Sequence, residues 1–206
     1  MSTTKTRRSV SLLAAFAVAA GVLALPAAAS QATPTFGLAA TTERPASLVD
    51  LDPAKTGSIT IHKLVKQDDN GTKEGNGLLD PSATGKPLAG ATFTVEKLTS
   101  VDLTKQEGWE KLANYRKGKG DEKISANAAA IAAARADGTA APVSMTTGDD
   151  GLANFNNLAL GAYIVTETQT PAGYTGSRPF IITVPMTHPT ELNNWVYDVH
   201  AYPKRS

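Results

Sequence analysis

The sequence predicts a mainly β fold, an antiparallel β-sandwich with an inserted helical segment. After residue 57, about six or seven short stretches are rich in β-branched and aromatic residues, which favour strands. Turn sequences with Gly, Pro, Asn and Asp separate these stretches. Between residues 102 and 138 the pattern changes to apolar residues at helical spacing, followed by an alanine-rich run. Many short strands with frequent turns are typical of a sandwich.

Residues 1–32 are predicted to be a signal peptide that directs export. Basic residues precede an apolar run of signal-peptide length, and small residues follow that run. A transmembrane anchor is the alternative, but the run is shorter than the roughly 20 apolar residues that a membrane span needs. We expect cleavage between Ser30 and Thr33, and a flexible lead-in over 33–56 before the folded domain, 57–206.

The composition narrows the possible functions of the exported part. The chain has no cysteine, so its stability must come from a core or from a crosslink other than a disulfide. A formal net charge of +1 gives no reason to expect nucleic acid or an anionic membrane as a partner. With only three histidines and no cysteine, we expect neither a transition-metal centre nor another cofactor.

The predicted strands follow one another along the chain with turns between them. In the first, Ile59, Ile61 and Lys63 share one face, so Lys63 points inward if the isoleucines do. The helical segment is expected to cover an edge or a face of one sheet. Strands are predicted at 59–65, 87–98, from 153, at 163–168, at 180–185 and in the run that begins at Trp195.

The last residues form a short aromatic and β-branched run that predicts a terminal strand. Pro203 ends this strand, because proline has no N–H for the ladder and fixes its own φ. Lys204 follows directly, so its amine is placed at a strand end rather than within the sheet. There it could be the nucleophile of an amide-forming reaction; the alternative is a solvated terminal lysine.

This run resembles the pilin motif of sortase-assembled Gram-positive pili, approximately W-x-x-x-V-x-V-Y-P-K. The residues that match in order and spacing are Trp195, Val199, Tyr202, Pro203 and Lys204, and Ala201 stands where a second valine is usual. The resemblance implies that Lys204 attacks a thioacyl intermediate between a pilin-class sortase and the preceding subunit. The product is a Lys–Thr isopeptide bond that joins neighbouring pilin subunits head to tail.

A second resemblance covers the sandwich itself. Residues 151–168 and 171–174 look like the core of a Cna B-type domain, an immunoglobulin-like sandwich of bacterial surface proteins. The Tyr-x-x-x-Glu-Thr segment that contains Glu167 resembles the pilin E-box, and residues 57–63 resemble the first strand of such domains. Together these resemblances imply the N-terminal domain of a SpaA-type major pilin or fimbrial shaft subunit.

Many domains of this type form an internal isopeptide bond between a first-strand lysine and a last-strand Asn or Asp, with an acidic residue assisting. By that resemblance Lys63 is the amine and Glu167 the acid, since burial favours a neutral lysine and a protonated glutamic acid. Arg205 stands where first pilin domains carry the Asn, and Asp198 lies too far before Lys204. We therefore predict no internal crosslink, and a buried charged or proton-sharing pair of Lys63 and Glu167. The alternative is a Lys63 that reaches solvent at a sheet edge and a solvated Glu167.

The absence of a crosslink leads to a hypothesis about the acceptor strand. The lysine must enter the sortase site, and a covalent clamp beside Lys204 would oppose movement of its strand, so we expect that strand to be mobile. The amine must also lose a proton, although a free lysine has a pKa of about 10.4. Asp198 and Glu191 are candidates to lower that free-energy cost if the fold brings them near.

The sequence thus predicts a structural subunit of a covalently polymerised pilus on the cell wall. Its expected partners are a pilin-class sortase, neighbouring pilin subunits, and host ligands reached through the assembled pilus. The alternative is a non-polymerised adhesin or matrix-binding domain of the same fold. An enzyme is not expected, because neither a Gly-x-Ser-x-Gly elbow nor a His-Glu-x-x-His motif occurs. No Leu-Pro-x-Thr-Gly sorting signal follows Lys204, so we interpret the sequence as a fragment or truncated product.

Overall fold

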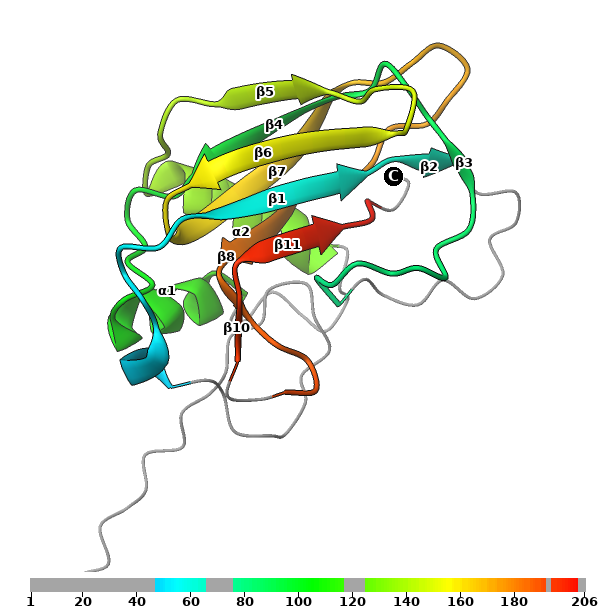
Figure 1. Ribbon diagram of the computed structural model, residues 1–206. Coiled ribbons are helices and arrows are strands. Elements are labelled where there is room, and N and C mark those ends of the chain that lie inside the picture. Colours follow the sequence, from blue (N-terminus) through cyan, green and yellow to red (C-terminus); the bar gives the residue numbers. More distant parts are fainter. Residues whose placement is uncertain (1–46, 66–75, 117–124, 192–193, 204–206) are drawn as a thin grey trace, which may run out of the picture. The chain divides into compact units, whose positions relative to one another are not determined.

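Two β-sheets and a pair of helices form three layers (Figure 1). The computed structural model describes residues 47–65, 76–116, 125–191 and 194–203. The first sheet has the strand order β11 (Asp198–Ala201), β1 (Gly57–His62) and β6 (Leu152–Leu158). The second has the order β5 (Val143–Thr146), β4 (Thr92–Lys97), β7 (Gly161–Gln169) and β8 (Phe180–Val184). The predicted mainly β sandwich with an inserted helical segment is confirmed.

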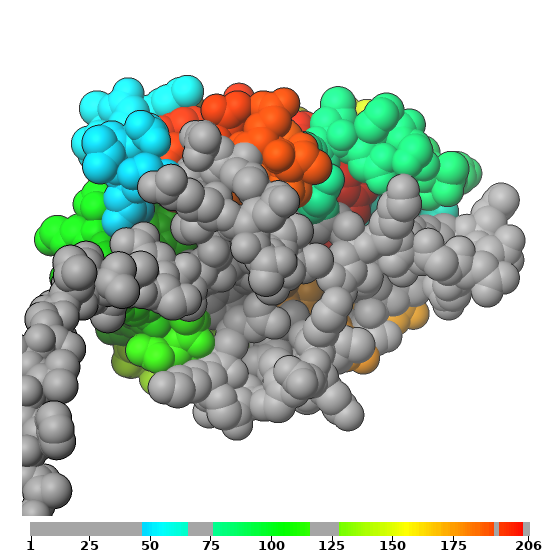
Figure 2. All heavy atoms as spheres, turned by 90° about the horizontal axis from the view of Figure 1, so that it is seen from below, coloured from blue at the N-terminus to red at the C-terminus, as the bar shows by residue number. Residues whose placement is uncertain are grey.

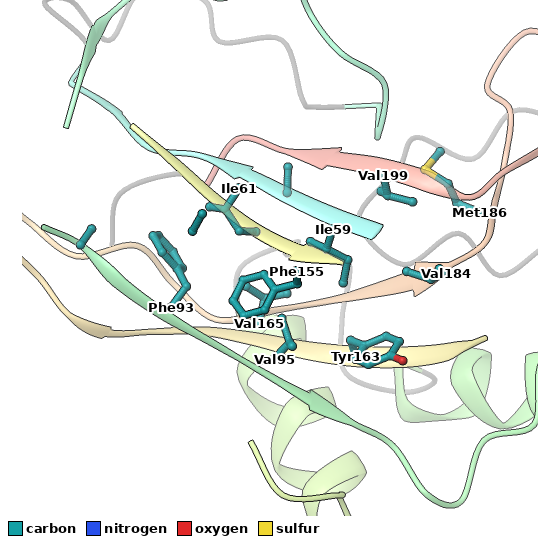
Figure 3. Packing of buried hydrophobic residues seen from close by; sticks show 13 residues of the cluster. Ile59, Ile61, Phe93, Val95, Phe155, Tyr163, Val165, Val184, Met186 and Val199 are labelled. Carbon is teal, nitrogen blue, oxygen red and sulfur yellow. The ribbon is translucent and has the colours of Figure 1, made fainter. Parts of the chain in front are cut away.

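The core between the two sheets follows from the alternation of side chains along each strand. Ile59 and Ile61 of β1 are fully buried, and they pack in one cluster with Phe155 of β6, Phe93 of β4 and Val165 of β7 (Figure 3). Full burial of such a side chain stabilises the fold by about 1.5–3 kcal/mol relative to leaving it exposed. Because Ile59 and Ile61 point inward, the face of β1 that continues to residue 63 is the core face.

The two helices cover the other face of the four-stranded sheet, as expected. α1 (Gln106–Arg116) and α2 (Ser125–Ala136) contribute a second buried cluster, which includes Trp109 and Leu112 at the spacing that predicts a helix. β7 is therefore buried on both sides, with Val165 facing the sandwich core and Ile164 facing the helices. A strand covered on both faces is apolar at consecutive positions, which is the pattern seen here.

The last strand departs from the predicted antiparallel arrangement. β11 pairs with β1 in parallel, with Ser58 opposite Asp198 and Ile61 opposite Ala201 (Figure 1). A parallel pair needs a long connection between its strands, and almost the entire domain connects these two. Periodicity along one strand shows which residues face the core, but it does not show the direction of the neighbouring strand.

Some predicted strands are divided in the structure, and one strand has no predicted counterpart. The first predicted strand ends at His62, and the terminal run is interrupted at Tyr197. β5 was not predicted, because its four residues are all exposed and show no alternation of buried and exposed positions. The two-residue strands pair as β2 (Leu64–Val65) with β3 (Lys86–Pro87), and β9 (Met186–Thr187) with β10 (Trp195–Val196).

The structure describes the N-terminal region from residue 47 onward. The predicted signal peptide and most of the lead-in lie outside the described residues; the end of the lead-in contains a 3-10 turn, η1 (Leu48–Asp50), capped by the side chain of Ser47. Within the described ranges, no helix is long and apolar enough to cross a membrane. In the same ranges, no group of three or more His, Cys, Asp or Glu side chains could hold a metal ion.

Candidate functional site

A lysine that follows β1 and a glutamate in β7 meet between the two sheets. Nζ of Lys63 lies 2.7 Å from Oε2 of Glu167, and the two side chains are 6% and 0% exposed. The Phe93 ring forms part of the surroundings, with its centroid 6.0 Å from Nζ of Lys63. This geometry contradicts the alternative in which Lys63 reaches solvent and Glu167 is solvated.

The Glu167 carboxylate accepts hydrogen bonds from several donors. Besides Lys63, Oε2 accepts from the backbone N–H of Ser177 at 2.6 Å and from its hydroxyl at 2.5 Å, and Oε1 accepts from the hydroxyl of Thr170 at 3.0 Å. Burial by itself raises the pKa of Glu167, but the hydrogen bonds from Lys63 and Ser177 outweigh it and hold that pKa below its ordinary value. Glu167 is therefore a carboxylate at neutral pH, so it faces Lys63 as a charged acceptor rather than as a protonated acid.

The backbone of Lys63 is fixed by the turn that precedes β6. Its N–H donates to the carbonyl of Gly151 at 2.8 Å, and its own carbonyl accepts from the N–H of Leu88 at 2.9 Å. Gly151 has a φ of +73°, and a Cβ added there would lie 2.7 Å from the carbonyl oxygen of Lys63. Glycine alone tolerates both this φ and this close approach. The turn thus sets the point from which the Lys63 side chain reaches Glu167.

β11 inserts the middle of the pilin-like run into the core. Val199 is fully buried and lies opposite Ile59 in the parallel ladder. Since the two strands run in the same direction, the chain leaves β11 at the end of β1 where Lys63 follows. Val199 anchors the middle of the acceptor strand in the core, and the mobility expected for this strand stays a prediction that hydrogen exchange would test. Lys204 and Arg205 lie outside the described residues.

The residues after β11 are held by side-chain contacts. The Tyr202 ring stacks on the ring of His62, with centroids 4.5 Å apart and an angle of 18° between the planes. The Tyr202 hydroxyl accepts a hydrogen bond from the N–H of Asp80 at 2.9 Å. Pro203, which is half-buried, is the last described residue. Tyr202 therefore fixes the chain immediately before the proline.

Trp195 has a different environment from the rest of the run. Its Nε1 donates to the carbonyl of Ser47 at 3.1 Å, and its ring lies 5.6 Å from that of Trp109 in α1. Figure 2 shows η1 (cyan) next to the orange segments that lead to β10. Trp195 thus ties β10 to the end of the lead-in and to the helical layer.

The two carboxylates considered as helpers for Lys204 have other partners. Asp198 accepts from the hydroxyl of Ser58 at 2.8 Å at the start of β11, about 16 Å before Pro203 at roughly 3.3 Å per residue. Glu191 accepts from the side-chain amide of Asn194 at 2.7 Å. Neither contact places a base beside the described end of the run.

Two features of this region are not predictable from the sequence pattern. Ser177 and Thr170 carry no sequence signal, because they lie in a loop whose path depends on the tertiary fold. The second feature is a contact between two histidines: Nε2 of His62 lies 2.9 Å from Nδ1 of His200. The parallel register brings them together, and the sequence pattern does not predict that register.

Known proteins are similar to this chain in sequence and in fold. Residues 54–206 match the family described as Gram-positive pilin subunit D1, N-terminal domain. The fimbrial subunit type 1 of Actinomyces viscosus is 38% identical over 208 residues, which cover 100% of this chain and 34% of that protein. The fimbrial protein FimP of Actinomyces oris has a TM-score of 0.61 and 33% identity, covering 84% of this chain and 32% of FimP. The full-length major pilin SpaD of Corynebacterium diphtheriae has a TM-score of 0.57 and 32% identity. This match covers 75% of this chain and 33% of SpaD.

The chain spans about a third of the length of these relatives. Its match begins at residue 54, just before β1, and includes both sheets, the helical pair and the pilin-like run. On this match and on its sandwich fold, the chain belongs to the family of Gram-positive pilin subunit D1, N-terminal domains.

Proposed function

We propose that this domain is the N-terminal part of a structural pilus subunit and that Lys204 is the amine by which a pilin-class sortase joins it to the preceding subunit. The observation that carries the proposal is the placement of the terminal run. Val199 is anchored in the core, Tyr202 is held against β1 after the end of β11, and Pro203 directly precedes Lys204. The relatives named as fimbrial subunits and a major pilin support the same role.

The proposed reaction is acyl transfer to an amine. The Lys204 amine attacks the thioacyl carbonyl, a C–N bond forms, the C–S bond breaks, and the sortase thiol leaves as a thiolate. The amine must first lose a proton, which costs about 4.6 kcal/mol at pH 7 for a lysine of ordinary pKa. Because Asp198 and Glu191 are engaged elsewhere, we assign the base to the sortase. In this reaction the chain is a substrate and not an enzyme.

The buried ion pair has a structural role in this proposal. Lys63 and Glu167 link the two sheets at the position where related domains have an isopeptide bond, and here no acyl donor stands in the expected place. The chain is exported by its signal peptide and acts in a pilus at the cell surface. Its partners are the sortase and neighbouring subunits, and host ligands are bound through the assembled pilus.

A conjugation experiment tests the acceptor assignment. The purified chain is incubated with a pilin-class sortase and a peptide that carries a sorting signal of the Leu-Pro-x-Thr-Gly type. We expect one conjugate for the native chain, none for Lys204→Ala, and native yield for Lys105→Ala, which removes a lysine whose side chain is 68% exposed. Native yield from Lys204→Ala would refute the assignment. The absence of any conjugate with the native chain would favour the non-polymerised adhesin.

A further inference from the structure

We propose that His62 and His200 are positioning residues for the acceptor lysine. Their hydrogen bond, and the stacking of Tyr202 on His62, hold the chain beyond β11 in the orientation that presents Lys204 to the sortase. This inference rests on the proposed function, because it assumes that Lys204 is the acceptor.

The two rings lie on the outer face of the three-stranded sheet. β1 and β11 both direct alternate residues inward, namely Ile59, Ile61, Val199 and Ala201, so His62 and His200 point away from the core. Nε2 of His62 and Nδ1 of His200 are 2.9 Å apart, with ring centroids at 5.2 Å and an angle of 44° between the planes. His62 therefore contacts His200 by a hydrogen bond and Tyr202 by ring stacking.

These contacts act where the backbone ladder stops. β11 ends at Ala201, and Pro203 has no N–H to donate. Between these two residues, the stacking of Tyr202 on His62 links the chain to β1, and the Tyr202 hydroxyl accepts from the N–H of Asp80. If His62 turns away, Tyr202 loses the ring on which it stacks and keeps the bond to Asp80, so the direction in which the chain continues is less firmly fixed.

The contact between the histidines requires a shared proton. One ring nitrogen must donate and the other must accept, whereas two imidazolium rings would both be donors and would repel each other. Burial lowers the pKa of His62, and the neighbouring His200 lowers it further, while Asp150 in the turn before β6 raises it. Burial also lowers the pKa of His200, and Asp198 raises it. Asp80 contacts Tyr202 through its backbone N–H, and its carboxylate accepts from Ser82. The pair is therefore stable at neutral pH and breaks on acidification.

A competition between two acceptors tests this role. Equal amounts of the native chain and a variant compete for one pilin-class sortase and one sorting-signal peptide, from about pH 7.5 to about pH 5. The mass-resolved product ratio gives the ratio of kcat/KM, so the titration of Lys204 and the pH dependence of the sortase cancel. The informative variant is His200→Asn, which leaves the His62 ring under Tyr202. Its amide takes the position of Nδ1 and does not titrate in this range, and the amide oxygen can accept from Nε2 of His62 whether that ring is neutral or charged. The control is His188→Asn, which keeps an acceptor for the N–H of Glu191 away from the pair.

We expect His200→Asn to match the native chain at pH 7.5 and to exceed it by at least about tenfold at pH 5, since a misplaced acceptor reacts far more slowly. His200→Ala should react at least about tenfold more slowly than the native chain at pH 7.5, through a higher KM with kcat retained, because fewer molecules present the lysine. At pH 5 it should react at about the rate of the native chain, in which the pair is then broken as well. His188→Asn should follow the native chain throughout.

A product ratio of native chain to His200→Asn that stays constant between the two pH values would overturn the inference, whether or not His200→Ala folds. The proposed function is tested separately by Lys204→Ala in the same mixture. If Lys204→Ala is conjugated like the native chain, the acceptor assignment fails. If it is inert while the ratio stays constant, only the positioning role fails.

Discussion

The ammonium of Lys63 lies 2.7 Å from the carboxylate of Glu167 and joins the two sheets of the sandwich. Removing two charges from water costs several kcal/mol per ion, so such a pair persists only where its geometry and further hydrogen bonds are good. Ser177 and Thr170 provide those bonds to the carboxylate. A buried ion pair thus connects the sheets where no covalent bond is predicted.

Breaking this pair on one side should destabilise the domain strongly. Lys63→Met leaves the Glu167 charge buried without its counter-ion, and we expect a loss of about 3–5 kcal/mol in the free energy of unfolding. The double variant Lys63→Met/Glu167→Gln should lose clearly less than the sum of the two single changes, because the remaining charge is also removed. Urea unfolding of the native chain, the two single variants and the double variant measures these free energies.

A partly exposed ion pair provides the matched control for that cycle. Arg135 and Glu96 are 2.6 Å apart, but their side chains are 42% and 17% exposed. Arg135→Met should change the free energy of unfolding by at most about 1 kcal/mol. Additive effects in the Lys63 and Glu167 cycle, or equal losses for the buried and the exposed pair, would contradict the assigned coupling.

The free energy of unfolding should fall on acidification in two separate ranges of pH. The pKa values of His62 and His200 are lowered mainly by burial, so the unfolded chain binds protons first, and stability declines as the pH drops below about 6.5. The Glu167 pKa is lowered in the folded state, so its contribution is complete above about pH 4.5 and is lost as the pH falls through the folded pKa.

Variants separate the two ranges. Urea unfolding between about pH 8 and about pH 3 should show a smaller upper decline for His62→Gln/His200→Asn and a smaller lower decline for Glu167→Gln. If the native chain kept the same free energy of unfolding from pH 7 to pH 5, the titration assigned to the histidines would be wrong.

The intact mass of the folded chain should equal the sum of its residues. An internal bond from Lys63 to an Asn would lower the mass by one ammonia, and a bond to an Asp would lower it by one water. We expect neither loss, because Arg205 occupies the place of the acyl donor. Electrospray mass spectrometry of the purified chain measures this directly, and a cross-linked peptide containing Lys63 would disprove the prediction.

The sequence was sufficient for features set by local patterns. Alternation in β1 placed Ile59 and Ile61 in the core and turned residue 63 the same way, and the spacing of Trp109 and Leu112 predicted α1. The parallel pairing of β11 was not predictable, because strand direction depends on the path of the entire chain between the partners. The contact between His62 and His200 depends on that register, so it was missed for the same reason.

Two glycines with similar backbone angles should respond differently to substitution. Gly151 has a φ of +73°, and an added Cβ would meet the carbonyl oxygen of Lys63, whereas Gly173 has a φ of +83° and open space around it. Gly173→Ala should cost about 1–2 kcal/mol through backbone strain alone. Gly151→Ala should cost more, since it also displaces Lys63 from the position that reaches Glu167. Thermal unfolding compares them, and a Gly151→Ala variant no less stable than Gly173→Ala would count against this anchoring of Lys63.

The position of the new bond in the sortase product tests the central claim most directly. Tandem mass spectrometry of the conjugate between the native chain and a sorting-signal peptide locates the acylated amine. We expect one linkage, from the threonine carbonyl to Nζ of Lys204. A linkage at another lysine or at the N-terminal amine, with Lys204 unmodified, would contradict it.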